Sequence, residues 1–146
     1  MDRARRAGLT ALIVVAMVAA PGGPAGLPTL AASVGWPPST FVLSEIQTGG
    51  ASASDEFVEI ANQGTSVVDL VGLELVYATA SGSTVTRKAV WDTSTELPPG
   101  RRILVANSSG MLAALADALY TGGFAATGGA LALRVVGGSV VDSVGW

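Results

Sequence analysis

The sequence predicts an all-β protein in which two sheets pack as a sandwich. Short runs of alternating apolar and polar residues recur along the chain at intervals of roughly 10 residues, and Gly, Asn and Ser separate them. In residues 56–61, Val58 and Ile60 fall on one face of the expected strand, as they do when that face is buried. Near the C-terminus, Gly137-Gly138 between two alternating runs is a strong signal for a hairpin.

Seven strands account for these runs. They are expected at 41–48, 56–61, 67–79, 84–91, 101–107, 130–136 and 139–144. Within the longest run, Gly72 predicts a bend or a bulge, and Leu73 and Leu75 share one face. In the run that follows, Thr86 and Lys88 are expected on a solvated face.

One short helix is expected among the strands. Residues 108–110 can cap its start, and Leu112, Leu115 and Leu119 follow at helical spacing within 111–119. We favour a helix that packs over a sheet edge, and a helix that binds a partner is the alternative. The predicted fold class is therefore an all-β sandwich with one short helix.

The N-terminal segment has the order of a secretory signal peptide. Basic residues come first, an apolar run follows at 11–20, and prolines and small residues come next. The run is short for a bilayer span, which takes about 20 apolar residues, so an uncleaved anchor or a mis-assigned start codon is the alternative. We expect a signal peptide at 1–32, a linker at 33–40 and the folded domain at 41–146, in a protein that is secreted, extracellular or on the cell surface.

Charge and composition exclude several classes of function. The full chain carries 8 basic and 11 acidic residues, and loss of 1–32 would remove three arginines and one aspartate, leaving 5 and 10. An acidic module offers no basic surface for nucleic acid, so we expect no nucleic-acid partner and no stable membrane insertion after cleavage. The chain has no His and no Cys, which removes the usual general base, zinc ligands and disulfides.

Four carboxylates form the main cluster of ionisable residues. The first two strands are expected to bring Glu45 close to Glu56 or Glu59. Three interpretations stay open: a calcium site with Asp55 and Glu56 as candidate ligands, a hydrolase with two carboxylates, and carboxylates that are solvated or cap backbone groups. The sequence favours the last, because a calcium loop of alternating Asp and Asn is missing. We expect no catalytic residue and no cofactor other than calcium.

The other polar candidates are ascribed to structure. Lys88 is the only lysine, it lies beside Arg87, and no Ser-x-x-Lys motif is present. Arg101-Arg102 could bind a carboxylate or a phosphate, but such charges at an exposed sheet edge usually serve solubility. Trp91 is expected in the core, whereas Trp146 is expected at the surface if a further segment normally covers it. The tryptophans show no sugar-stacking platform.

The domain resembles the lamin tail domain family, an immunoglobulin-like module. The motifs are SEI at 44–46, DEFVEI at 55–60 followed by Asn62, VDL at 68–70 with GLEL at 72–75, LPPG at 97–100 with ILV at 103–105, and LAL at 131–133 with VVDSVGW at 140–146. None is specific alone, but five occur in the order of the family. Leu73 stands where the family often has Trp. Members usually continue past Trp146, so a missing last segment with an unpaired edge is one alternative.

The resemblance implies a non-enzymatic binding, adhesion or accessory module of the bacterial secreted type. Bacterial members often lie beside secreted or surface hydrolases. The partner would be a protein, a polysaccharide or a cell-envelope component, recognised by exposed strand edges and loops. Two alternatives stay open. One is a targeting module or a truncated fragment of a larger secreted nuclease or phosphoesterase, and the other is a calcium-dependent surface adhesin.

Overall fold

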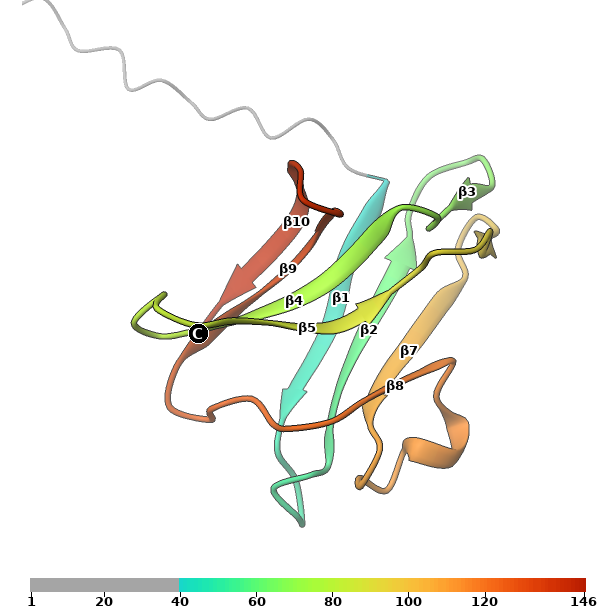
Figure 1. Ribbon diagram of the computed structural model, residues 1–146. Coiled ribbons are helices and arrows are strands. Elements are labelled where there is room, and N and C mark those ends of the chain that lie inside the picture. The colour runs from blue at the N-terminus through green and yellow to red at the C-terminus, as the bar shows by residue number, and fades with distance from the viewer. Residues whose placement is uncertain (1–39) are drawn as a thin grey trace, which may run out of the picture. The chain divides into compact units, whose positions relative to one another are not determined.

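Two four-stranded sheets pack face to face in the computed structural model, which describes residues 40–146 (Figure 1). The strands are β1 Phe41–Thr48, β2 Glu56–Asn62, β3 Val68–Asp69, β4 Leu73–Thr79, β5 Val85–Val90, β6 Glu96–Leu97, β7 Arg102–Asn107, β8 Ala118–Tyr120, β9 Gly129–Val135 and β10 Val140–Gly145. The first sheet has the order β1-β2-β7-β8 and the second β10-β9-β4-β5, while β3 and β6 form a small ribbon. The predicted signal peptide and nearly all of the predicted linker lie outside the described residues.

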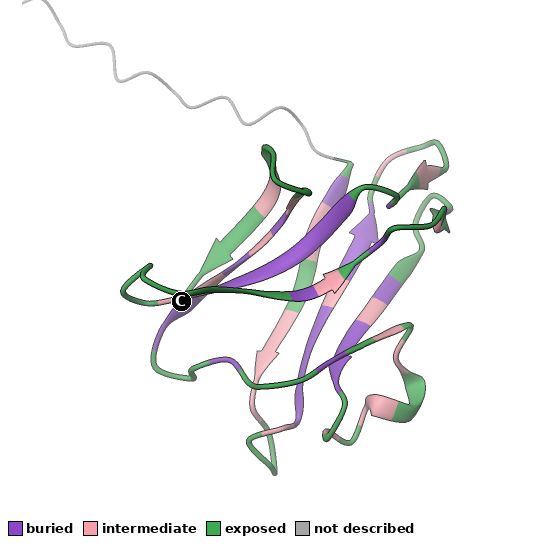
Figure 2. Ribbon diagram, in the orientation of Figure 1, coloured by how far each residue is buried: buried purple, intermediate pink, exposed green. Residues whose placement is uncertain are grey.

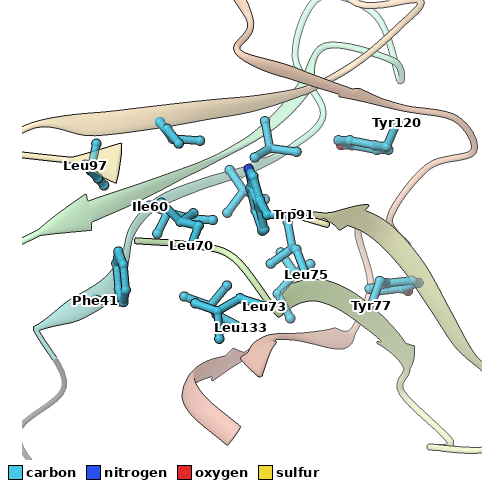
Figure 3. Packing of buried hydrophobic residues seen from close by; sticks show 14 of the residues in the cluster. Phe41, Ile60, Leu70, Leu73, Leu75, Tyr77, Trp91, Leu97, Tyr120 and Leu133 are labelled. Carbon is cyan, nitrogen blue, oxygen red and sulfur yellow. The ribbon is translucent and has the colours of Figure 1, made fainter. Parts of the chain in front are cut away.

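The core fills the space between the two sheets. Strands β2 and β4 are buried along much of their length (Figure 2). Alternation turns one face of each strand inward, so that Ile60, Leu75 and Tyr77 belong to one core cluster (Figure 3). Ile60 and Leu75 are fully buried. Trp91 joins the same cluster, which confirms its predicted place in the core. The faces predicted from alternation in these two strands are therefore confirmed.

The turns at Gly137 and Gly72 confirm two predictions, and one short strand lies where none was predicted. Gly137 has a φ of +66° in the turn between β9 and β10, as the predicted hairpin requires. Gly72 has a φ of +81°, and the chain turns there, so the run predicted at 67–79 is divided into β3 and β4 at the predicted bend. The ribbon strand β6 lies between the strands predicted at 84–91 and 101–107, where no strand was predicted.

The predicted helix at 111–119 is wrong. The chain instead forms a single 3-10 turn, η1, at Ala113–Leu115, and then β8, which pairs in parallel with β7. Asp117 explains the strand, because its N–H donates to the Leu104 carbonyl and its carboxylate accepts the Leu104 N–H. A helix of nine residues is marginal without tertiary support, and Leu115 is 73% exposed, so packing supplies none.

The four edge strands of the sandwich carry features that hinder pairing with another chain. Irregularities interrupt the register of β1 near Leu43, of β10 near Val140 and of β5 near Lys88. The fourth edge strand, β8, has only three residues. Bulges and very short edge strands both work against strand addition, so the edges of this sandwich are poor templates for a partner strand.

Candidate functional site

Strand β5 places two neighbouring cations on opposite faces of the second sheet. Arg87 pairs with Val76 and Ala89 pairs with Leu75, so Lys88 is the extra residue of a bulge. The Lys88 side chain lies between the sheets and only 8% of the residue is exposed. The predicted solvated face is therefore wrong for Lys88. Thr86 pairs with Tyr77, so the face of β5 that Thr86 and Lys88 share looks into the sandwich, where the segment after β8 covers Lys88.

Inside the sandwich, Lys88 holds the segment that crosses from β8 to β9. Its Nζ donates to three successive carbonyls, at 3.3 Å to Thr121, 3.1 Å to Gly122 and 3.2 Å to Gly123. An ammonium group has three N–H donors, and three acceptors match them. Lys88 is thus engaged in holding backbone.

Aromatic rings surround the same ammonium group. Lys88 Nζ lies 5.0 Å from the ring centre of Tyr120, 5.3 Å from that of Phe124 and 5.6 Å from that of Tyr77. These distances are within the range of cation–π attraction. Burial lowers the pKa of Lys88, and the negative charge of Glu56 acts in the opposite direction.

Glu56, on β2, is the carboxylate of this interior cluster. It is 3% exposed, and its Oε1 accepts the Phe124 N–H at 2.8 Å while its Oε2 accepts from Asn107 Nδ2 at 3.2 Å. A Cβ at Gly123 would lie 3.1 Å from Glu56 Oε1, so glycine permits the close approach. Burial raises the pKa of Tyr120, and the charge of Glu56 raises it further.

Trp146 closes the end of the crossing segment. Its indole N–H donates to the Ala125 carbonyl at 2.9 Å, and its ring stacks on Tyr77 with centroids 6.0 Å apart. The Tyr77 hydroxyl accepts the Ala125 N–H at 3.0 Å. Trp146 remains 38% exposed, so one part of the ring is packed and another faces solvent.

The other predicted carboxylates lie on the first sheet and its loops. Glu45 lies directly opposite Glu59 across β1 and β2, which confirms one of the two predicted neighbours, and Arg102 pairs with Glu59 at 3.2 Å. Asp55 Oδ1 accepts the N–H of Met111 at 3.0 Å, and its Oδ2 accepts a loop N–H at 2.8 Å. Asp55 therefore caps backbone groups, and the calcium site at Asp55 and Glu56 stays a prediction.

A second buried carboxylate, Glu74 on β4, faces outward from the second sheet and lies beneath two arginines. Arg87 Nε donates to Glu74 Oε2, and Arg134 Nε on β9 donates to Glu74 Oε1 at 2.8 Å. Burial alone would raise the pKa of Glu74, but hydrogen bonds and charges from the arginines outweigh it and hold the pKa below its ordinary value. Sequence reasoning missed this cluster, because its members are 13 and 60 residues apart.

The comparisons with known proteins identify the family. The family model described as Lamin Tail Domain matches residues 37–146. The chain belongs to the lamin tail domain family. No curated protein matches the sequence.

Among solved structures, this lamin tail domain is similar to archaellum periplasmic stator proteins from Sulfolobus acidocaldarius. One match is to a chain of the FlaF and FlaG complex, with 9% identity, a TM-score of 0.45, and coverage of 74% of this chain and 89% of that one. Another is to FlaG, with 7% identity, a TM-score of 0.44, and coverage of 74% and 99%.

Two hollows mark the surface of the lamin tail domain near these clusters. One, of about 350 Å³, lies between the edges of β5 and β8 and includes Arg87 and Lys88. The other, of about 510 Å³, is lined by small residues of β4, β9 and β10 and by Trp146. Among the residues that the structure describes, no helix is long and apolar enough to cross a membrane.

Proposed function

We propose that this lamin tail domain is an exported, non-enzymatic binding module for a component of the cell envelope or its surroundings. The observation that carries the proposal is the use of the buried ionisable groups. Lys88 donates hydrogen bonds to three backbone carbonyls, and Glu56 accepts hydrogen bonds from the Phe124 N–H and from Asn107. Groups held in this way stabilise a scaffold.

The same contacts argue against catalysis at the interior cluster. A nucleophile or general base needs a free lone pair within reach of its substrate. Lys88 would have to lose a proton and leave three carbonyls to act as a base, and Glu56 would have to release the crossing segment. Both changes would cost the fold its internal support.

Recognition by a sheet face fits the architecture better than recognition by strand edges. The edges of the sandwich are interrupted by bulges or are very short. The outer face of the second sheet, by contrast, presents partly exposed arginines above a buried carboxylate. We therefore place the binding surface on that face.

Export is proposed from the N-terminal sequence, whose basic, apolar and small-residue regions have the order of a signal peptide. The full chain, expressed in a bacterial host with a secretion pathway, should appear outside the cytoplasm. Intact mass and N-terminal sequencing should show a new terminus close to residue 33. Retention in the cytoplasm with the original N-terminus would contradict export.

Two measurements on the exported protein test the remaining parts of the proposal. Isolated cell envelopes should co-sediment the protein, with a supernatant control that lacks envelopes. Chromogenic phosphodiester and glycoside substrates should show no turnover above the blank. Turnover that is lost in Glu56→Gln would overturn the non-enzymatic assignment, and absence of any sedimentation would overturn binding to the envelope.

A further inference from the structure

We propose that Arg87 and Arg134 form a binding site for the carboxylates of an acidic polysaccharide in which charged and neutral sugars alternate. The inference rests on the proposed binding function and names its ligand class. The site lies on the outer face of the second sheet, where strands β5 and β9 flank Glu74 on β4.

The geometry of the arginine pair leaves donors free. Each guanidinium uses its Nε–H for Glu74, and within residues 40–146 the terminal nitrogens of Arg87 and Arg134 make no further hydrogen bond. An arginine has five N–H donors in a planar fork that matches a carboxylate. The Arg87 side chain is 53% exposed and that of Arg134 is 33% exposed, so these forks are accessible.

The charge of the cluster is not balanced. One carboxylate faces two guanidiniums, and Glu74 is only 1% exposed, so an incoming anion can meet the arginines without displacing it. The low pKa of Glu74 keeps it ionised. The cluster of Glu74, Arg87 and Arg134 therefore carries one net positive charge. Glu74 holds both guanidinium groups in place, as a preorganised anion site requires.

The rest of the domain limits the kind of anion. Residues 40–146 carry 5 basic and 10 acidic side chains, so their summed field repels a densely charged polymer. A ligand that carries isolated carboxylates among neutral groups meets the local positive charge with less of this repulsion. This favours an acidic polysaccharide with widely spaced charges over a densely charged polymer.

The surface beside the arginines suits sugars. Four residues along β4 from Glu74, a distance of about 13 Å, Ala78 lies in the hollow of about 510 Å³ that Trp146 borders. Ala78 and Ala130 give this hollow an apolar floor. On the loop that follows β4, the hydroxyl groups of Ser81 and Ser83 are linked at 2.7 Å and are solvent exposed. An oligosaccharide can span from the arginines to this hollow.

The test titrates the exported protein with a hyaluronate hexasaccharide, in which glucuronate alternates with a neutral sugar, at low ionic strength by calorimetry. Arg87→Gln and Arg134→Gln should each weaken binding about tenfold. The matched control is Arg102→Gln, which removes an arginine paired with Glu59 on the other sheet and should change binding less than about twofold. The carboxyl-reduced hexasaccharide should bind at least about tenfold more weakly than the acidic form.

A second measurement does not depend on folding of the variants. In the wild-type protein, the NMR signals of Nε–H at Arg87 and Arg134 should move on addition of the hexasaccharide, while that of Arg102 should stay in place. Equal losses in all three variants, or binding of the reduced sugar as tight as that of the acidic one, would overturn the site. No detectable binding of the hexasaccharide would also overturn it. If envelopes still sediment the protein, the binding function survives and only this ligand class fails.

Discussion

Two neighbouring residues of β5 serve two buried glutamates on opposite sides of one sheet. Lys88 lies inside the sandwich near Glu56, and Arg87 lies outside it on Glu74. The interior cation is surrounded by carbonyls and rings, whereas the outer cation keeps half of its side chain in solvent. Buried Lys88 thus stabilises the interior, whereas exposed Arg87 can bind a ligand, because burial decides whether the N–H donors of a cation remain free.

The largest effect is expected for Lys88→Met, which retains much of the side-chain volume and removes the charge. It would remove the positive charge that acts on buried Glu56 and leave three carbonyls without their donor. We expect a loss of about 3–5 kcal/mol in the free energy of unfolding, measured by urea unfolding with tryptophan fluorescence. Arg87→Met is the matched neighbour, with an expected cost of about 1 kcal/mol. A larger cost for Arg87→Met would reverse the comparison.

The outer cluster, formed by Glu74, Arg87 and Arg134, has two arginines for one carboxylate, and a double-mutant cycle should show that either arginine can stabilise Glu74 alone. Arg87→Gln or Arg134→Gln alone should cost little, about 1 kcal/mol, because Glu74 keeps one arginine. Together they leave a buried carboxylate without a cation, so the double variant should cost more than the sum, by about 0.5–3 kcal/mol. Urea unfolding of the four proteins measures the coupling. Simple additivity would show that the arginines act independently.

Low pH should remove the stability that ionised Glu74 contributes to the outer cluster. The pKa of Glu74 is held below its ordinary value of 4.5, so its ionised form stabilises the fold above that pH, and the contribution is lost as pH falls through the lowered pKa. Glu74→Gln should therefore flatten the fall in stability below about pH 4.5. Urea midpoints across this range measure the effect, with the exposed Glu96→Gln as a control. If stability fell as steeply below about pH 4.5 in Glu74→Gln as in the wild type, Glu74 would not be the group responsible.

The smallest effect is expected from calcium. The four carboxylate oxygens of Asp55 and Glu56 each accept a hydrogen bond from a protein N–H group, so binding a cation would disrupt existing contacts. We expect the thermal midpoint of the exported protein to be the same with calcium and with chelator. Calcium at 100 times its dissociation constant would instead stabilise by about 2.7 kcal/mol, and such a shift would restore the adhesin alternative.

Local patterns predicted the sandwich but not its charge clusters. Alternation placed Ile60 and Leu75 on inward faces, since period-2 burial is visible in neighbouring residues. The helix at 111–119 failed because apolar residues at helical spacing carry no information on whether a sheet covers them. Lys88 was misplaced because alternation tells which residues share a face but not which face is covered, and that depends on the register with β4 and on the segment after β8.

The sequence by itself determined most of the long strands, the Gly-Gly hairpin and the family, because each depends on residues close together in the chain or on motifs in order. Only the tertiary structure decided that Glu56 and Lys88 brace the interior and that Glu74 gathers Arg87 and Arg134 on the surface. Those contacts join residues on different strands. Their partners are chosen by sheet order and register, which are set by packing of the whole core.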